Sequence, residues 1–140
     1  MIDNGNGTVT DEATGMMWQQ ETAMFMTWKD ALSYCEKLQL AGYTDWRLPV
    51  SAELNSIIDD IDDDDIDDKP AINRQYFPRA VASFYWSSTI AASNTSYAWG
   101  VFFDTGNTYE TDKNGHWFVR AVRNVYGVVT RAKKEQLTLF

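Results

Sequence analysis

Residues 84–103 read FYWSSTIAASNTSYAWGVFF, and residues 117–123 read WFVRAVR. In this part of the chain, aromatic clusters alternate with spacers rich in Ser, Thr, Asn, Asp and Gly. Aromatic and β-branched residues separated by turn residues predict several antiparallel strands from Phe84 onward. The turns are expected at Asp104–Asn107 and Asp112–Gly115. Aromatic clusters can form a core while short polar side chains decorate its loops, which suits a binding surface better than a catalytic pocket.

The residues at the start of the chain predict a hairpin and a further short strand. Asp3–Thr8 is a turn sequence with two Asn-Gly steps, and Thr8–Thr10 follows it as a strand. Gly15–Gln19 reads as the next strand. A calcium-binding EF-hand loop needs oxygen ligands at its first, third and fifth positions, and here Gly5 and Gly7 occupy the latter two. We therefore interpret the segment as a tight turn.

Two helices are expected in the middle of the chain. The first begins after Thr27, whose side chain can cap it in a box-like pair with Asp30, and it ends at Ala41-Gly42. Its apolar residues recur at helical spacing, and they are Trp28, Ala31, Leu32, Cys35 and Leu38. The second helix takes Ser51 as its cap and runs through Ile58.

The composition indicates one globular domain. The chain has 140 residues, of which 44% are hydrophobic and 14% aromatic, so it can bury a core. Eight aspartates between Asp59 and Asp68 account for the net charge of −8, because the remainder has 12 acidic and 12 basic residues. That remainder lacks the basic footprint of a nucleic-acid partner. No apolar run approaches the roughly 18 residues of a membrane helix, so membrane insertion is not expected.

We expect a folded domain at residues 1–123 and a C-terminal extension at residues 124–140. The extension alternates apolar and charged segments, which suits docking on the domain or formation of a homo-oligomer. The first residues lack the basic flank and the apolar segment of a signal peptide. The expected localisation therefore stays open between the cytoplasm, a virion and export by another route.

Five motifs resemble one protein family in both content and order. They are GTVTDEATGMMWQQ, TWKDALSYCEKLQLAGYTDWRLP, FYWSST, YAWGVFF and FVRAVR, and together they span most of the chain up to Arg123. The sequence resembles the DUF1566 family, which is also called the Lcl C-terminal domain family. The resemblance implies an α+β fold of the C-type-lectin-like superfamily, with two helices packed on a small twisted antiparallel sheet and with the chain ends close together.

The resemblance also bears on charged residues. Arg47 and Arg123 match the family's motifs, and we interpret their role as structural, with an arginine that hydrogen-bonds buried carbonyl groups. A ligand contact by Arg47 is the alternative. The motifs of calcium-dependent sugar-binding lectins are absent, so no sugar–calcium chemistry is carried over and no cofactor is expected. The aspartates at Asp59–Asp68 form a longer acidic run than this family leads us to expect. They can be read as a solvated loop or as a Ca²⁺ site, and we favour the solvated loop.

The functional hypothesis places ligand contacts on the spacers, with aromatic residues such as Trp86 and Trp99 as the scaffold. Many spacer residue types can be reached by randomising adenines in an Asn codon, so the pattern resembles the variable proteins of diversity-generating retroelements. Ordinary loops also use these residues. The predicted ligand-binding residues are Ile90, Ala91, Ala92, Ser93, Asn94, Tyr97, Gly100, Phe102, Asp104, Asn107, Thr108, Asp112, Asn114, Gly115 and His116.

The sequence argues against an enzyme. Cys35, the only cysteine, lies on the apolar stripe of the first helix, where a buried hydrophobe is expected rather than a nucleophile. His116 is the only histidine, and no phosphate loop, serine elbow or metal-spaced His/Cys set is present. We therefore expect a receptor-binding or adhesion domain, of phage or bacterial type, for a surface protein or a glycan. A glycan- or glycosaminoglycan-binding adhesin and a structural assembly subunit are the alternatives.

Overall fold

A computed structural model describes residues 1–58 and 72–125. The aspartate run at Asp59–Asp68 and most of the extension at 124–140 lie outside the described residues. In the part of the chain that is described, no helix is long and apolar enough to cross a membrane.

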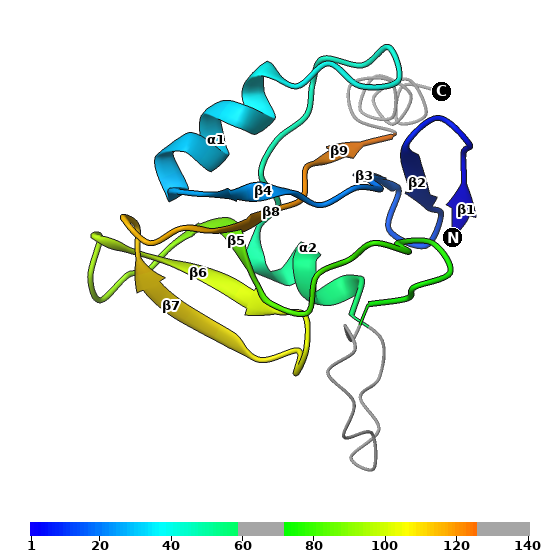
Figure 1. Cartoon of the computed structure of the whole chain (residues 1–140). Coiled ribbons are helices and arrows are strands. Elements are labelled where there is room, and N and C mark those ends of the chain that lie inside the picture. The colour runs from blue at the N-terminus through cyan, green and yellow to red at the C-terminus, as the bar shows by residue number, and fades with distance from the viewer. Residues whose placement is uncertain (59–71, 126–140) are drawn as a thin grey trace, which may run out of the picture.

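The described chain folds into two sheets and two short helices (Figure 1), so the expected α+β class is confirmed. The four-stranded sheet has the order β1-β2-β3-β9, with β1 at Ile2–Asp3, β2 at Thr8–Asp11, β3 at Met16–Gln19 and β9 at Val122–Asn124. The five-stranded sheet has the order β4-β8-β5-β6-β7, with β4 at Ala23–Met26, β8 at Trp117–Val119, β5 at Phe84–Ile90, β6 at Tyr97–Phe102 and β7 at Thr108–Asp112.

Most expected elements are confirmed, and the pairing of the strands adds two features. The hairpin of β1 and β2, the strand β3 and both expected turns after β6 are present. β4 was not predicted, because its sequence AMFM has no alternation of polar and apolar residues. The strands after Phe84 are not all antiparallel, since β5 and β8 pair in parallel at Tyr85 and Phe118.

The two helices begin close to the predicted positions but end earlier. α1 spans Trp28–Lys37, and the Thr27 side chain accepts a hydrogen bond from the Asp30 amide at 3.3 Å, which confirms the cap. Ala41 and Gly42 both have positive φ, at 55° and 84°, so they form a separate turn after the helix rather than its stop.

α2 spans Ser51–Ser56, so Ser51 is its first helical residue and not its cap. The Glu53 carboxylate takes over the cap, accepting from the Val50 amide at 2.9 Å and from the Arg47 guanidinium at 2.7 and 2.8 Å. The Ser51 amide instead donates to the Thr89 hydroxyl at 3.1 Å, which fixes the start of α2 to strand β5.

The helices lie on opposite faces of the five-stranded sheet (Figure 1). Side chains alternate between the faces of a strand, and the two core clusters follow this alternation. On the face of α1, the buried residues include Ala31, Cys35, Phe84, Trp86 and Ala98. On the face of α2, they include Leu54, Ile57, Tyr85, Val101 and Phe103. The predicted role of Trp86 in the core is confirmed, whereas Trp99 is only half-buried.

The arginine that hydrogen-bonds buried carbonyl groups is Arg120, between β8 and β9. Its side chain is fully buried and donates to the Gln19 carbonyl at 2.7 Å and to the Thr22 hydroxyl at 2.8 Å. The guanidinium lies over the ring of Phe77 at 4.7 Å, and burial lowers the pKa of Arg120. Arg120 therefore ties the chain between β3 and β4 to the two C-terminal strands.

Arg47 and Arg123 are also structural, as expected, but each pairs with a carboxylate. Arg47 holds Glu53, and Arg123 donates to the Asp45 carboxylate at 2.6 and 3.1 Å. The hydrogen bond from Arg123 holds the pKa of Asp45 below its ordinary value. Arg47 and Val122 also exchange two main-chain hydrogen bonds at 2.9 Å. The main-chain bonds of Arg47 and the side chain of Arg123 therefore both fasten the connector before α2 to strand β9.

Candidate functional site

The predicted ligand-binding residues gather at two ends of strands β6 and β7. At one end, the β5–β6 loop lies beside the β7–β8 turn, because the Lys113 amide donates to the Ser96 carbonyl at 3.0 Å. At the other end lies the β6–β7 turn. β6 has six residues, so the two ends are separated by about 17 Å. The first end holds Ile90, Ala92, Ser93, Asn94, Tyr97, Asp112, Asn114, Gly115 and His116, and the second holds Phe102, Asp104, Asn107 and Thr108.

Ala91 and Gly100 were wrongly predicted as contact residues. Ala91 has no exposed surface, because it turns inward where the β5–β6 loop leaves the sheet. Gly100 is buried against its neighbour strand, and a Cβ atom there would lie 2.3 Å from the Phe84 ring and 2.4 Å from the Tyr85 carbonyl oxygen. The small size of both residues is a requirement of the core and not an adaptation of a variable surface.

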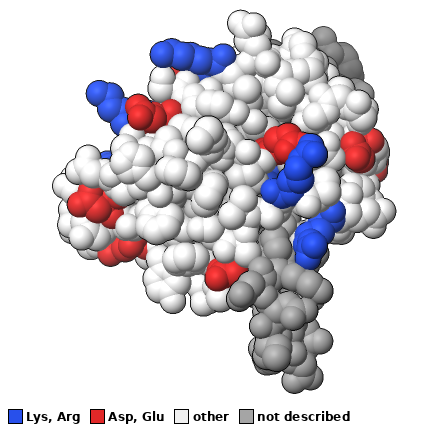
Figure 2. All heavy atoms as spheres, viewed as in Figure 1, with Lys and Arg blue, Asp and Glu red and all other residues white. Residues whose placement is uncertain are grey.

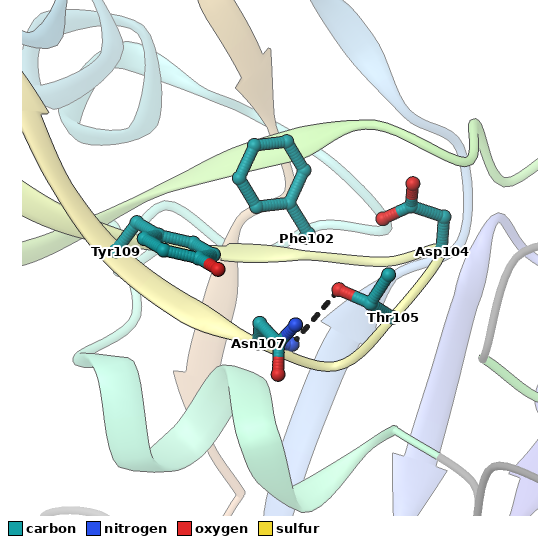
Figure 3. Close-up of a pocket in the computed structure, with 5 residues that line it drawn as sticks. All are labelled: Phe102, Asp104, Thr105, Asn107 and Tyr109. Atoms are coloured by element: carbon teal, nitrogen blue, oxygen red, sulfur yellow. Dashed lines mark hydrogen bonds between the residues drawn. The ribbon is translucent and has the colours of Figure 1, made fainter.

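A hollow of about 330 Å³ opens at the β6–β7 turn. It is lined by Phe102, Asp104, Thr105, Asn107 and Tyr109 (Figure 3). The rings of Phe102 and Tyr109 meet edge to face with centroids 5.4 Å apart, and Tyr109 is 52% exposed. The turn is held in shape by a hydrogen bond from the main-chain amide of Asn107 to the Thr105 hydroxyl at 3.2 Å.

Three of the five residues that line this hollow were predicted from the sequence, and Thr105 and Tyr109 were missed. Tyr109 lies opposite Gly100 in the register of β6 and β7, and its ring packs against Phe102 on the same face of the sheet. It is an aromatic residue in the otherwise polar strand TYETD. An aromatic residue flanked by polar residues within a strand is the sequence signal that could have identified it.

The family comparison covers the elements that build this hollow. The model of the Lcl C-terminal domain matches residues 7–123, from the β1–β2 hairpin to β9. The chain belongs to the Lcl C-terminal domain family. A comparison with curated proteins gave no match.

The packed part of this Lcl C-terminal domain continues slightly beyond the expected boundary at Arg123. Strand β9 ends at Asn124, whose side chain accepts a hydrogen bond from Arg47 at 2.6 Å. The Val125 amide donates to the Gly15 carbonyl at 2.8 Å, and its side chain packs on the core at the α1 face. The folded domain therefore includes at least Val125.

The surface around the hollow is acidic. Residues 80–112 contain Asp104, Glu110 and Asp112 and no Lys or Arg. Figure 2 shows the same distribution, because its lower left part, over β6 and β7, carries acidic and no basic side chains. The three acidic residues are exposed, and no hydrogen bond of the described residues engages the carboxylate of Asp104 or Glu110.

The strands under this surface of the Lcl C-terminal domain are anchored from both sides. The Ser87 hydroxyl donates to the Trp99 carbonyl at 2.6 Å, and the Trp28 indole of α1 donates to the Ser87 carbonyl at 2.8 Å. On the α2 side, the side-chain amide of Asn55 donates to the Thr108 hydroxyl at 3.2 Å. The predicted contact residues therefore extend from a scaffold whose position is fixed by both helices.

The two residues that the sequence analysis considered for catalysis, Cys35 and His116, do not line the hollow. Cys35 has no exposed surface, and burial, with a smaller effect of Glu36, raises the pKa of its thiol to about 12. A thiol with that pKa is a poor nucleophile near neutral pH. His116 is exposed in the β7–β8 turn, at the opposite end of β7 from the hollow.

Proposed function

We propose that this chain is a non-enzymatic ligand-binding domain for receptor binding or adhesion. Its contact surface is the hairpin of β6 and β7, centred on the hollow at the β6–β7 turn. The observation that carries the proposal is the hollow itself, in which an exposed tyrosine and a half-buried phenylalanine meet an unengaged carboxylate and a turn amide. Aromatic faces with a few polar groups at their rim are typical of recognition sites.

The proposed fold is the C-type-lectin-like fold. It is supported by the helix on each face of the five-stranded sheet and by the pairing of β3 with β9. That pairing joins strands from the beginning and the end of the domain, as the resemblance implies. A solved crystal structure of the chain, compared with lectin-like domains, tests this assignment.

We also propose that the exposed spacer residues are diversified by a retroelement. The support is that 13 of the 15 residues predicted for the site, all except Ala91 and Gly100, are at least partly exposed on the loops and strands around β6 and β7. A near-identical, adenine-rich repeat beside a reverse-transcriptase gene is the expected genomic finding. Close relatives that keep residues 90–116 constant, in genomes without such a repeat, would remove this part of the proposal.

The acidic charge of the hairpin of β6 and β7 favours some of the expected ligand classes over others. A glycosaminoglycan is a polyanion, and within the described part of the chain the hairpin of β6 and β7 carries no Lys or Arg to neutralise it. A protein or a neutral glycan fits better. The other alternative, a subunit that assembles through residues 124–140, rests on a segment outside the described residues. It predicts that a chain ending at Val125 loses its oligomeric state in light scattering.

The proposed function is tested by binding of the full chain to arrays of glycans and surface proteins and to intact cells. Tyr109→Ala and Asn107→Ala remove two walls of the hollow, and Glu12→Ala, in the exposed β2–β3 turn, is the matched control. We expect the first two variants to lose binding while the control keeps it. Binding that survives both hollow variants at full strength refutes the assignment of the surface.

A further inference from the structure

The outer edge of β7 carries a second feature that the hollow does not use. Among the described residues, β7 is the last strand of its sheet, and it pairs only with β6. An edge strand presents unpaired main-chain groups to solvent, and these can pair with an added strand. β7 has five residues, TYETD, which is long enough to pair with an extended peptide.

The register shows which main-chain groups are free. The Phe102 amide donates to the Asn107 carbonyl at 2.8 Å, and the Lys113 amide donates to the Ser96 carbonyl at 3.0 Å. In an antiparallel pair, hydrogen-bonded positions alternate, so Tyr109 and Thr111 direct their main-chain groups toward β6. The N–H and C=O groups of Thr108 and Glu110 and the N–H of Asp112 therefore point outward.

The side chains of β7 give the edge two different faces. Glu110 lies opposite Trp99 and shares its face of the sheet with Thr108 and Asp112. Tyr109 lies on the other face, where it contacts Phe102 in the hollow. A strand added to this edge would place its alternate side chains against two carboxylates on one face and against aromatic rings on the other.

The acidic face also discriminates between partners. If a second copy added its own β7 antiparallel about a two-fold axis through Glu110, Glu110 would face Glu110 and Thr108 would face Asp112. Like charges directly opposite each other destabilise such a pair. A partner strand with Lys or Arg at alternate positions would instead meet opposite charge, and residues 80–112 carry no basic side chain to compete with it.

We propose that the ligand of this domain is a protein segment that adds to β7 as an extended strand, with basic side chains facing Glu110 and Asp112 and apolar side chains alternating with them toward Tyr109 and the hollow. This inference rests on the proposed function, because it names the ligand class of the same surface. Main-chain hydrogen bonds supply the pairing, and the alternating side chains supply the specificity.

The test uses fluorescently labelled heptapeptides and the full chain, with binding measured by anisotropy at low and at physiological salt. The probe is Lys-Val-Arg-Tyr-Lys-Val-Arg, and its acidic counterpart has Glu at the four basic positions. We expect the basic peptide to bind at least about tenfold more tightly than the acidic one, and salt to weaken its binding. Glu110→Lys should weaken it by about fivefold to tenfold, whereas Glu12→Lys, in the β2–β3 turn, should leave it unchanged.

Two N-methylated versions of the probe distinguish strand addition from simple charge attraction. One version carries methyl groups on the main-chain nitrogens of the four basic residues, and the other carries them on those of the three apolar residues. Because successive N–H groups of an extended strand point to opposite edges, each version blocks one edge of the peptide. We expect one version to lose binding and the other to retain most of it. Any one of three results overturns the inference. They are equal binding of both versions, equal effects of Glu110→Lys and Glu12→Lys, and no binding of the basic probe.

The outcomes also separate this inference from the proposed function. If array binding depends on Tyr109 and Asn107 but no peptide binds, the proposed surface stands and the strand-addition inference fails. If light scattering shows a dimer of the full chain that Glu110→Pro, which removes an outward N–H of β7, dissociates, β7 pairs with a second copy and the inference of a basic partner is wrong.

Discussion

Replacing Gly100 by alanine tests most sharply whether the small residues of β6 belong to the scaffold. The added Cβ would lie 2.3 and 2.5 Å from two atoms of the Phe84 ring and 2.4 Å from the Tyr85 carbonyl oxygen. Ordinary contacts of a Cβ are about 3.4 Å or longer, so the ring and the main chain of β5 must both move by about an ångström. Overpacking of this kind costs about 1–3 kcal/mol, and the involvement of the main chain places it at the upper end.

One effect opposes this cost. Alanine restricts the unfolded chain more than glycine, which stabilises the folded state by about 0.4–1 kcal/mol. The expected net loss for Gly100→Ala is about 2 kcal/mol, and for a domain of this length it corresponds to a fall in melting temperature of about 7 °C. The assay is thermal and urea unfolding of the full chain, with the exposed Ala92→Ser as the control, for which a change below about 0.5 kcal/mol is expected.

A second variant identifies the cause of the loss. Phe84→Leu removes the ring atoms that meet the new Cβ but leaves the Tyr85 carbonyl oxygen in place. The double variant Gly100→Ala/Phe84→Leu should therefore lose about 1 kcal/mol less stability than the sum of the single variants. The reasoning is refuted if Gly100→Ala melts within a degree of the wild type. It is also refuted if the two substitutions are strictly additive.

Three further outcomes follow from the buried charges and the buried thiol. Arg120→Met should cost about 3 kcal/mol in urea unfolding, because the buried Gln19 carbonyl and the part-buried Gln20 carbonyl lose the donor that the guanidinium supplies; a loss below about 1 kcal/mol would contradict this. Burial acts to raise the pKa of Glu53, but hydrogen bonds from Arg47 and a main-chain amide outweigh it and hold the pKa below the ordinary 4.5. Its stabilisation is therefore present above that pH and is lost as the pH falls, so melting temperatures between about pH 5 and pH 3 should drop more steeply for the wild type than for Glu53→Gln, and parallel curves would argue against it. Cys35, with a pKa of about 12, should react with a thiol reagent at pH 8 only when urea unfolds the chain, and rapid labelling of the native protein would show that the thiol is accessible.

The sequence was most informative where local chemistry determines the structure. The Thr27 cap, the turns after β6 and the apolar stripe of α1 each depend on residues close together in the chain, and all are present. Features that depend on distant partners were missed. β4 forms because Ala23 and Met26 pair with β8, and the parallel contact between β5 and β8 joins Tyr85 to Phe118.

The candidate site shows the same limit. Composition identified the polar spacers, but it could not separate exposed small residues from buried ones. Ala92 is exposed and Ala91 is buried, although they are neighbours of the same type, because the loop turns between them. Gly100 resembles a loop glycine in composition, and only its pairing with β5 shows that a side chain is excluded there. Tyr109 became part of the site through its contact with Phe102 across the hairpin.

The central claim is that the hairpin of β6 and β7 binds a ligand while the strands beneath it maintain the fold. The most direct measurement compares array binding and melting temperature for Tyr109→Ala and Gly100→Ala in the full chain. We expect Tyr109→Ala, at a site 52% exposed, to abolish binding and to change the melting temperature by no more than about 3 °C. Gly100→Ala should lower the melting temperature by about 7 °C. Full binding by Tyr109→Ala, or equal destabilisation by both variants, would contradict the account.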